Sequence, residues 1–325
     1  AGLKSVGSYK YIMANTLGER DLSQPIFISP ADLQSIKACG VTFAVSMIER
    51  VIEERAAGDA DRAAEVRSKV LGVIGGEIDT LVPGSPEALR LEELMRREGL
   101  WSQYMEVGIG PYAEVFTKSQ PMSSIGIGAL AGLNPISSWN NPEPEIVLAV
   151  TADGEVAGAT LGNDVNLRDV EGRSALLLGK AKDNNASCSL GPFIRLFDET
   201  FSIDDVREAQ VALTIDGADD GFRLEDGSNM KKISRDVLDL VGQTYNDCHQ
   251  YPDGFMLFTG TLFAPTRDRD GAGQGFTHKE GDRVRISTGK LGMLENTMTW
   301  SNLAPRWEFG IGALITNLSE RGILY

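Results

Sequence analysis

Cysteine is scarce in this chain, with three residues among 325, and apolar runs of membrane-spanning length are missing. Cys39, Cys188 and Cys248 form neither an even set nor a metal-binding spacing. The sequence therefore excludes a disulfide framework and favours reduced thiols. No stretch approaches the ~20 apolar residues of a transmembrane helix, and no signal-peptide core is visible. These absences predict a cytoplasmic protein without a membrane partner.

Basic residues are outnumbered, since 31 Lys and Arg stand against 46 Asp and Glu, for a net charge of −15. Phosphate backbones are bound by clustered Lys and Arg, and no basic stripe with interleaved aromatics occurs, so a nucleic-acid partner is excluded. The chain contains two histidines, His249 and His278, and neither has a partner at ligand spacing. Structural histidines are therefore expected, not a histidine metal site.

Three carboxylates carry the main chemical signal. Glu143 and Glu145 stand two positions apart at the start of the apolar run Ile146-Val147-Leu148. Side chains alternate along a strand, so both carboxylates should lie on one face and repel each other unless a cation lies between them. Asp164 follows after a predicted strand return. The three residues predict a site for a hard divalent ion, Mg²⁺ in the first place, with Ca²⁺ and Mn²⁺ as alternatives.

The pattern of elements predicts an α+β fold that is mainly β. Residues 31–99 have helical character, with helices expected over 31–37, 44–57, 59–73 and 86–97. From Ile146 onward, short β-branched runs alternate with Gly, Asp and Asn turns. Strands are expected over 146–150, 211–215 and 283–287. Because sustained βαβ alternation is missing, a doubly wound parallel sheet is excluded.

Four motifs in order resemble the fumarylacetoacetate hydrolase superfamily, over a region from about residue 30 to the end. One is Gly158–Val165 followed by Arg168-Asp169, and another is Lys182–Cys188 followed by Leu190-Gly191-Pro192. The others are Phe116-Thr117-Lys118 with Ser123-Ser124, and Thr259-Gly260-Thr261 with Glu280-Gly281-Asp282.

The resemblance implies a mixed β-roll with a helical lid, a divalent metal and chemistry on 2-oxo acids. Residues 30–325 would form the catalytic domain, with a helical insertion at 44–105, and residues 1–29 would be the remnant of a small N-terminal domain. The implied metal ligands are again Glu143, Glu145 and Asp164. Lys182 would be catalytic, and the implied substrate contacts are Arg168, Glu171, Thr261 and Lys118.

The chain departs from the hydrolases of this family at the lid. Their lid helix has a His–Glu pair that activates water, whereas here Ser46 occupies the histidine position and Glu49 remains. Serine cannot act as a general base near neutral pH. Ser46 and Glu49 are retained as catalytic candidates. For Glu49 a solvated helix position is an equally open interpretation, and for Ser46 an ordinary small helix residue is the favoured one.

Within the family, residues 179–188, 249–254 and 273–279 look most like the 2-keto-3-deoxy-pentonate dehydratases. Dehydration needs no nucleophilic water: a C3 proton is removed, and the enolate expels the C4 hydroxyl. The expected product of a 2-oxo sugar acid of xylonate or arabonate type is 2,5-dioxopentanoate, in oxidative pentose catabolism. Lys182 could stabilise the enolate as a cation or act as the base. A hydrolase of acylpyruvates or 2,4-diketo-3-deoxy sugar acids and a non-catalytic 2-oxo acid binder remain alternatives, and a homodimer or homotetramer is expected.

Overall fold

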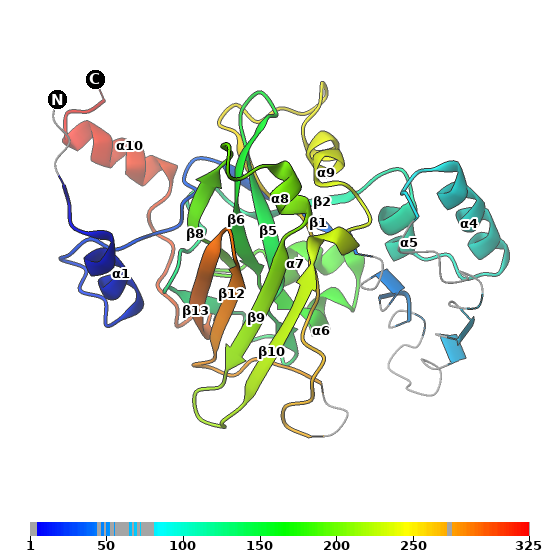
Figure 1. Cartoon of the computed structure of the whole chain (residues 1–325). Coiled ribbons are helices and arrows are strands. Elements are labelled where there is room, and N and C mark those ends of the chain that lie inside the picture. The colour runs from blue at the N-terminus through cyan, green and yellow to red at the C-terminus, as the bar shows by residue number, and fades with distance from the viewer. Residues whose placement is uncertain are drawn as a thin grey trace.

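Two β-sheets form the centre of the molecule (Figure 1). The structure is a computed structural model, and it describes residues 5–43, 47–48, 50–52, 55, 65–66, 68–69, 72, 81–271 and 275–324. The six-stranded sheet has the order β2-β1-β11-β5-β6-β8. Its strands are β1 (Ser35–Gly40), β2 (Glu114–Ser119), β5 (Pro144–Val150), β6 (Val156–Asp164), β8 (Cys188–Leu196) and β11 (Phe255–Phe258).

The second sheet has five strands in the order β10-β9-β12-β13-β3. They are β3 (Leu130–Leu133), β9 (Gln210–Asp216), β10 (Arg223–Asn229), β12 (Arg283–Thr288) and β13 (Gly292–Trp300). The short strands β4 (Asn140–Asn141) and β7 (Asn166–Leu167) form a separate pair. Apolar side chains of both sheets, such as Leu148 and Ile286, share one buried core. The predicted strands 146–150, 211–215 and 283–287 fall inside β5, β9 and β12, which confirms the α+β, mainly β prediction.

Helices lie around the sheets and in one side unit (Figure 1). They are α1 (Tyr9–Leu17), α4 (Pro86–Arg97), α5 (Gln103–Ile109), α6 (Arg168–Glu171), α7 (Leu178–Lys182), α8 (Ile203–Arg207), α9 (Val237–Thr244) and α10 (Ile311–Glu320). The prediction of a helix over 86–97 is confirmed. Ser85 caps it by accepting a hydrogen bond from the Ala88 N–H, and Pro86 occupies its first turn.

The predicted helical insertion lies between β1 and β2, which pair with each other in the sheet. Met47, Ile48, Val51 and Ile52 are buried against Met95 and other apolar side chains of the α4–α5 unit. The apolar face predicted for residues 44–57 is thus confirmed at these four positions. Ser46 and Glu49 lie outside the described residues, as does most of the predicted helix 59–73.

The helix predicted over residues 31–37 is wrong, because β1 begins at Ser35. This strand lies between β2 and β11, so its backbone is paired on both sides. Ile36 and Ala38 are fully buried, at the spacing of two that a strand requires. Pairing with distant strands outweighs the local helical tendency of these residues.

The N-terminal segment packs onto the rest of the chain through α1. Ile12 and Thr16 are buried, and Arg20 donates a hydrogen bond of 2.8 Å to the carbonyl of Ile127. The origin of residues 1–29 as a domain remnant stays a prediction. Within the described residues, no helix is long and apolar enough to cross a membrane.

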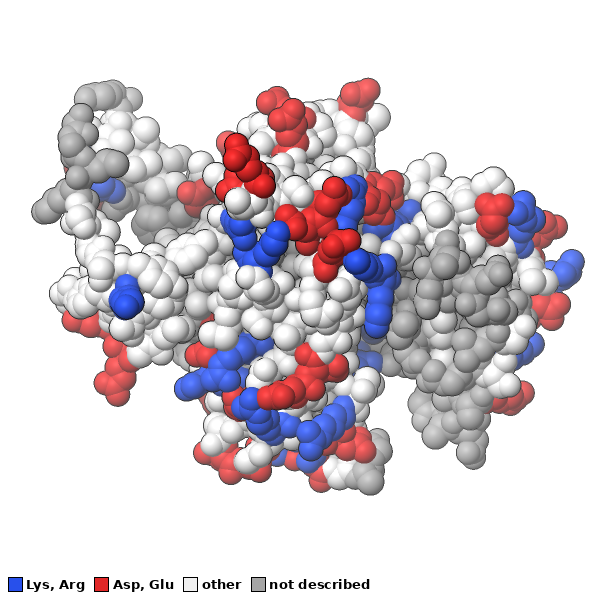
Figure 2. All heavy atoms as spheres, in the orientation of Figure 1, with Lys and Arg blue, Asp and Glu red and all other residues white. Residues whose placement is uncertain are grey.

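Charged side chains of both signs are interspersed on the face seen in Figure 2. On β9, β10 and β12 they pair across strands, as Arg223 and Arg285 both do with Asp216. This face therefore presents no continuous basic surface of the kind that nucleic-acid binding requires.

Candidate active site

The three predicted metal ligands converge at one end of the β5–β6 pair. Glu145 is in β5, Glu143 immediately precedes that strand, and Asp164 ends β6. These strands are antiparallel neighbours, and the Asp164 N–H donates a hydrogen bond of 3.0 Å to the Glu143 carbonyl. One carboxylate oxygen from each residue lies within 4.8 Å of the others, and all three side chains are buried. The fold thus brings together the three carboxylates that the sequence spacing predicted to form one site.

The clustering of negative charge changes the pKa of Glu145. Burial and the neighbouring Asp164 and Glu143 raise this pKa well above its usual value. Three buried carboxylates at this separation offer only oxygen donors, which suits a hard divalent cation. Such an ion would relieve the repulsion, so the residues present fit a Mg²⁺ site.

Two lysines contact the carboxylates. Lys182, at the end of α7, places its Nζ 2.5 Å from Glu143 Oε2 and 3.1 Å from Asp164 Oδ2. Burial disfavours its charge, but Asp164 and Glu143 more than compensate and raise the pKa of Lys182. This favours the cationic role for Lys182 over the role of a base.

Lys118 takes a different position from the one predicted. Its Nζ lies 2.7 Å from Asp164 Oδ1 and also bonds the carbonyls of Val165 and Lys182. The side chain is fully buried behind Asp164 and does not line the cavity. In this arrangement Lys118 holds Asp164 in place, and its predicted contact with substrate stays a prediction.

The loop after β11 supplies two further contacts. The Gly260 N–H donates a hydrogen bond of 2.7 Å to Glu145 Oε2, and the Thr261 hydroxyl lies 2.8 Å from Glu143 Oε2. Gly260 has φ +104, and a Cβ there would lie 1.9 Å from Thr42 Oγ1, so only glycine fits. Thr261 lines the cavity as predicted for a substrate contact, and it also orients a metal ligand.

Helix α6 carries the predicted Arg168 and Glu171, which both line the cavity. The Arg168 guanidinium lies over the Trp139 ring, 4.5 Å from its centroid. Glu171 forms an ion pair of 2.9 Å with Arg50 of the inserted segment. Burial raises the pKa of Glu171, but Arg50 and Lys182 outweigh this and lower it to about 2.

Asn166 connects Glu171 to the metal ligands. Its Nδ2 donates to Glu143 Oε1 at 2.9 Å and to Glu171 Oε2 at 2.5 Å. The chain Arg50–Glu171–Asn166–Glu143 thus joins the insertion to the carboxylate cluster. Glu171 therefore helps to orient the predicted metal ligand Glu143 through Asn166, and it also lines the cavity.

Replacing Glu171 with glutamine should weaken Mg²⁺ binding by about 10–100-fold, the usual cost of losing a partner of a metal ligand. The neutral amide pairs more weakly with Arg50 and accepts a weaker hydrogen bond from the Asn166 amide, so Glu143 is oriented less firmly. Titration calorimetry with Mg²⁺ measures this. Asp169→Asn on the same helix is the control, because Asp169 bonds Ser137 and Ser138 instead. Equal Mg²⁺ affinities in both variants would contradict the support role.

Glu114 is a site residue that the sequence interpretation missed. It begins β2, and it lines the cavity together with Phe116. Gly40 of β1 pairs with Glu114 of β2. A Cβ at Gly40 would lie 1.8 Å from Glu114 Oε2, so the glycine leaves room for this carboxyl. Burial and the charge of Glu171 raise the pKa of Glu114 to about 7. Glu114 alternates along this strand with Phe116 and Lys118 of the recognised motif. This alternation was the sequence signal that could have identified Glu114 as a site residue.

The cavity above the carboxylates has a volume of about 360 Å³. Its lining also includes residues of β1, of α7 and of the loop after β11. None of the described residues that line it is a histidine. His278 is buried elsewhere on Asp282, and His249 stacks on Tyr251 outside this cavity.

The chain is similar to known proteins over most of its length. Residues 143–299 match the family model for the fumarylacetoacetate (FAA) hydrolase C-terminal domain. A protein of Haloferax volcanii named "Probable 2-keto-3-deoxyxylonate dehydratase" is 29% identical over 297 residues, which cover 87% of this chain and 96% of that protein. A 2-dehydro-3-deoxy-D-arabinonate dehydratase of Saccharolobus solfataricus is 30% identical over 185 residues, covering 56% of this chain and 57% of that protein.

A solved structure shows the same fold. It is that of a 2-keto-3-deoxy-D-arabinonate dehydratase complexed with magnesium and 2,5-dioxopentanoate, with a TM-score of 0.60 and 20% identity. The match covers 91% of this chain and 82% of that chain. Residues 143–299 of this chain, which match the fumarylacetoacetate hydrolase family model, contain the carboxylate cluster and Lys182, and the predicted resemblance is confirmed.

Proposed function

We propose that this protein is a Mg²⁺-dependent hydro-lyase that converts a 2-keto-3-deoxy-pentonate into 2,5-dioxopentanoate. The two named relatives are dehydratases of this class, and the solved structure of similar fold contains magnesium and that product. The support from this chain itself is a buried carboxylate cluster with a lysine at its edge and a carboxyl of raised pKa in the same cavity.

Glu143, Glu145 and Asp164 would hold the metal ion. When bound there, Mg²⁺ supplies Lewis-acid polarisation of a 2-oxo acid. Lys182 lies beside two of these carboxylates and carries a positive charge, so it can stabilise negative charge that develops on the keto oxygen. Thr261 and Arg168 provide donors in the same cavity for the carboxylate and hydroxyls of the substrate.

Elimination also requires proton transfer. The C3–H bond breaks, its electron pair forms the new double bond, and the C4–O bond breaks as the leaving oxygen accepts a proton and departs as water. The product of this step is an unsaturated keto acid with a C3=C4 double bond and a hydroxyl on C5. Loss of a C5 proton and protonation of C3 move the double bond to C4=C5, and the resulting enol tautomerises to the aldehyde of the dioxo acid. Glu114 has a pKa of about 7, so at neutral pH it can both accept the C3 proton and deliver one to the C4 hydroxyl. Ser46 and Glu49 of the inserted segment remain proposed contributors, on a lid helix over residues 40–57.

One observation favours dehydration over C–C bond hydrolysis. Hydrolases of this family activate water with a His–Glu pair, and none of the described residues lining the cavity is a histidine. Elimination needs only the enolate-stabilising group and a carboxyl for proton transfer, and both are present.

The test is incubation of the Mg²⁺-loaded protein with 2-keto-3-deoxy-xylonate, 2-keto-3-deoxy-arabonate and, separately, an acylpyruvate. A dehydratase forms a semialdehyde, which a coupled dehydrogenase assay detects, and releases no pyruvate. Pyruvate release from the acylpyruvate would establish the hydrolase instead. Mg²⁺-dependent binding of all three acids without turnover would establish a binding protein.

Glu114→Gln should lower turnover by about 10²-fold or more, because it removes the proposed proton carrier. The same change should increase the free energy of unfolding above pH 7. The pKa of Glu114 rises from 4.5 to about 7 on folding, so the folded protein is penalised when this carboxyl ionises. The penalty is absent below the unfolded pKa of 4.5 and complete above about 7, where it is on the order of 3 kcal/mol.

Denaturant unfolding at pH 5 and pH 9 in EDTA, combined with turnover at each pH, measures both effects. Glu199→Gln, at an exposed position, is the control and should change neither quantity. A fully active Glu114→Gln enzyme would place the proton-transfer group elsewhere, with Glu49 as the next candidate.

We further propose a cytosolic, homo-oligomeric enzyme of pentose catabolism. The three cysteines are free thiols, and Cys248 is exposed, which suits a reducing compartment. Helix α10 has no buried residue, and Ile311 and Ile315 on it are exposed, so a second copy of the chain is the expected partner for this helix. Light scattering of the purified protein distinguishes monomer, dimer and tetramer.

A further inference from the structure

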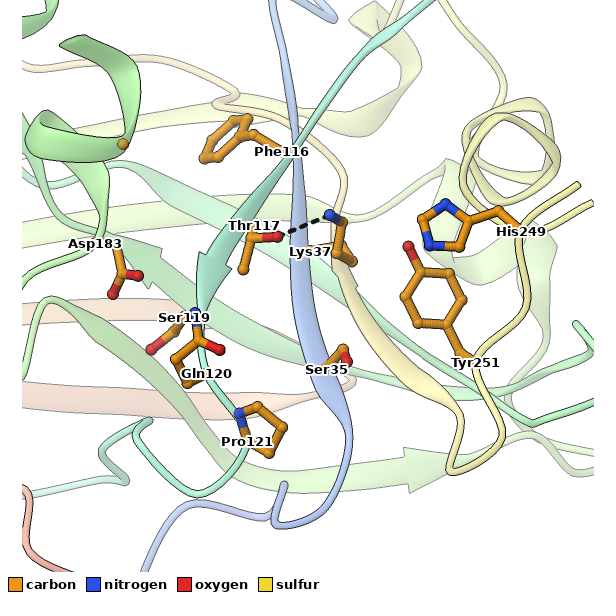
Figure 3. Close-up of a pocket in the computed structure, with 11 residues that line it drawn as sticks. Ser35, Lys37, Phe116, Thr117, Ser119, Gln120, Pro121, Asp183, His249 and Tyr251 are labelled. Carbon is orange, nitrogen blue, oxygen red and sulfur yellow. Dashed lines mark hydrogen bonds between the residues drawn. The ribbon is translucent and has the colours of Figure 1, made fainter. Parts of the chain in front are cut away.

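A second cavity, of about 780 Å³, shares Phe116 with the lining of the proposed active site and is otherwise lined by different residues (Figure 3). Its polar lining includes Lys37 of β1, Thr117 of β2, Gln120, Asp183, His249 and Tyr251. The metal ligands and Lys182 are not part of this lining. The cavity is therefore a separate polar site, made by side chains that the proposed reaction does not use.

The wall between the two cavities is thin. Phe116 lines both of them, and its ring centroid lies 5.9 Å from Lys182 Nζ. Helix α7 is the other shared element, because Leu178 and Lys182 face the active site whereas Gly179 faces the second cavity. A ligand in the second cavity would thus lie one residue layer away from Lys182.

Lys37 is the strongest indication of what binds there. Its Nζ donates a hydrogen bond of 2.9 Å to Thr117 Oγ1, and it forms no ion pair with a carboxylate of the described residues. The side chain is half-buried, and burial lowers the pKa of Lys37. In a chain with a net charge of −15, a partly desolvated lysine without a carboxylate partner is an attractive position for an anion.

Tyr251 and His249 extend this polar side. Their rings stack with centroids 4.8 Å apart and an interplanar angle of 19°. Figure 3 shows both on the same side of the cavity as Lys37, with Asp183 on the opposite side. Tyr251 is buried, and burial raises its pKa, so the phenol keeps its proton and can donate a hydrogen bond. Three donors are therefore available for a carboxylate at this end.

The side of the cavity opposite Lys37 has hydrogen-bond acceptors. Asp183, Ser119 and Gln120 lie there (Figure 3). A carboxylate such as Asp183 accepts hydrogen bonds from hydroxyls, and the Gln120 amide can both donate and accept. The lining thus matches a molecule that has a carboxylate at one end and several hydroxyls along its length.

We propose that this cavity is a second, non-catalytic binding site for small polyhydroxylated monocarboxylates, the class of the aldonates. Lys37, His249 and Tyr251 bind the carboxylate, and Asp183 and Gln120 bind hydroxyls. The proposal concerns binding alone and does not rest on the proposed reaction.

The experiment is titration calorimetry of the full chain in EDTA, with D-gluconate as the probe. Without metal, the carboxylate cluster of the active site repels an anion, so binding reports the second cavity. Lys37→Met should weaken gluconate binding by about tenfold, the cost of one charge-assisted hydrogen bond. His249→Asn, at an exposed position where the fold is not at risk, should weaken it by about threefold.

Two controls locate the binding. Lys180→Met changes an exposed lysine outside the lining, and Arg168→Met removes a donor of the active-site cavity, so gluconate affinity should stay within about twofold in both. The proposal is overturned if gluconate does not bind the wild-type protein, if both Lys37→Met and His249→Asn bind it normally, or if only Arg168→Met loses it. None of these results depends on whether the protein dehydrates a keto acid.

Discussion

Replacing Glu145 with glutamine should abolish Mg²⁺-dependent turnover, with a loss of at least about 10³-fold. Glu145 lies at the centre of the carboxylate cluster and receives hydrogen bonds from Gly260 and Thr261. An amide at this position removes one negative charge and one strong oxygen ligand from a site suited to a hard cation. Glu143→Gln and Asp164→Asn should act in the same direction.

Without metal, the same substitution should leave the thermal stability of the protein unchanged or increase it. Burial and two neighbouring carboxylates raise the pKa of Glu145, so its charge is unfavourable without a cation. Glu145→Gln should therefore unfold at the same or a higher temperature than wild type in EDTA, yet gain no stability when Mg²⁺ is added. Thermal unfolding with and without Mg²⁺ measures this, and Glu155→Gln, at an exposed position, is the control. Full turnover of the wild-type protein in excess EDTA would disprove the metal assignment.

Replacing Lys182 with methionine should lower turnover by roughly 10²–10³-fold, the scale of one lost partner of a developing oxyanion. Its ammonium is the cation closest to the metal ligands, at 2.5 Å from Glu143 Oε2. Lysine is not itself a ligand, so Mg²⁺ binding should survive. The measurement is single-turnover kinetics at saturating Mg²⁺.

The same variant should be unstable without metal. Removing Lys182 leaves Glu143 and Asp164 buried with less compensation, and breaking a buried ion pair costs about 3–5 kcal/mol. Adding Mg²⁺ should restore most of this loss. Lys180→Met, two positions earlier on α7 and exposed, is the matched control. If Lys180→Met loses turnover and Lys182→Met does not, Lys180 is the catalytic lysine of this motif and Lys182 is not.

The carboxylate cluster was accessible from the sequence because its geometry is local. Glu143 and Glu145 share a face through the alternation of one strand, and Asp164 returns beside them on the next strand of a hairpin. Lys182 was found through its motif, and the structure brings its Nζ to the cluster as expected. Helix α4 was predictable for a similar reason, since its capping Ser85, Pro86 and amphipathic pattern are all contiguous.

The residues that sequence reasoning missed or misplaced are those whose roles depend on distant segments. Ser35–Gly40 becomes a strand because β2 and β11 pair with it on both sides, and this pairing brings Glu114 into the cavity opposite Gly40. Lys118 alternates onto the same face as Glu114, and only the fold shows that it is buried in an ion pair with Asp164. Glu171 likewise meets Arg50, which is 121 positions away in the chain.

The sequence by itself thus determined the carboxylate cluster, the motif lysine and the mainly β class, because strand alternation and contiguous motifs are properties of neighbouring residues. Only the tertiary structure decided that Glu114 has a raised pKa beside the cluster, that Arg50 is linked to Glu143 through Glu171, and that Lys37 and His249 face a second cavity. The physical reason is that burial and the charges of neighbours, which set these properties, arise only when strands far apart in the chain pair with one another.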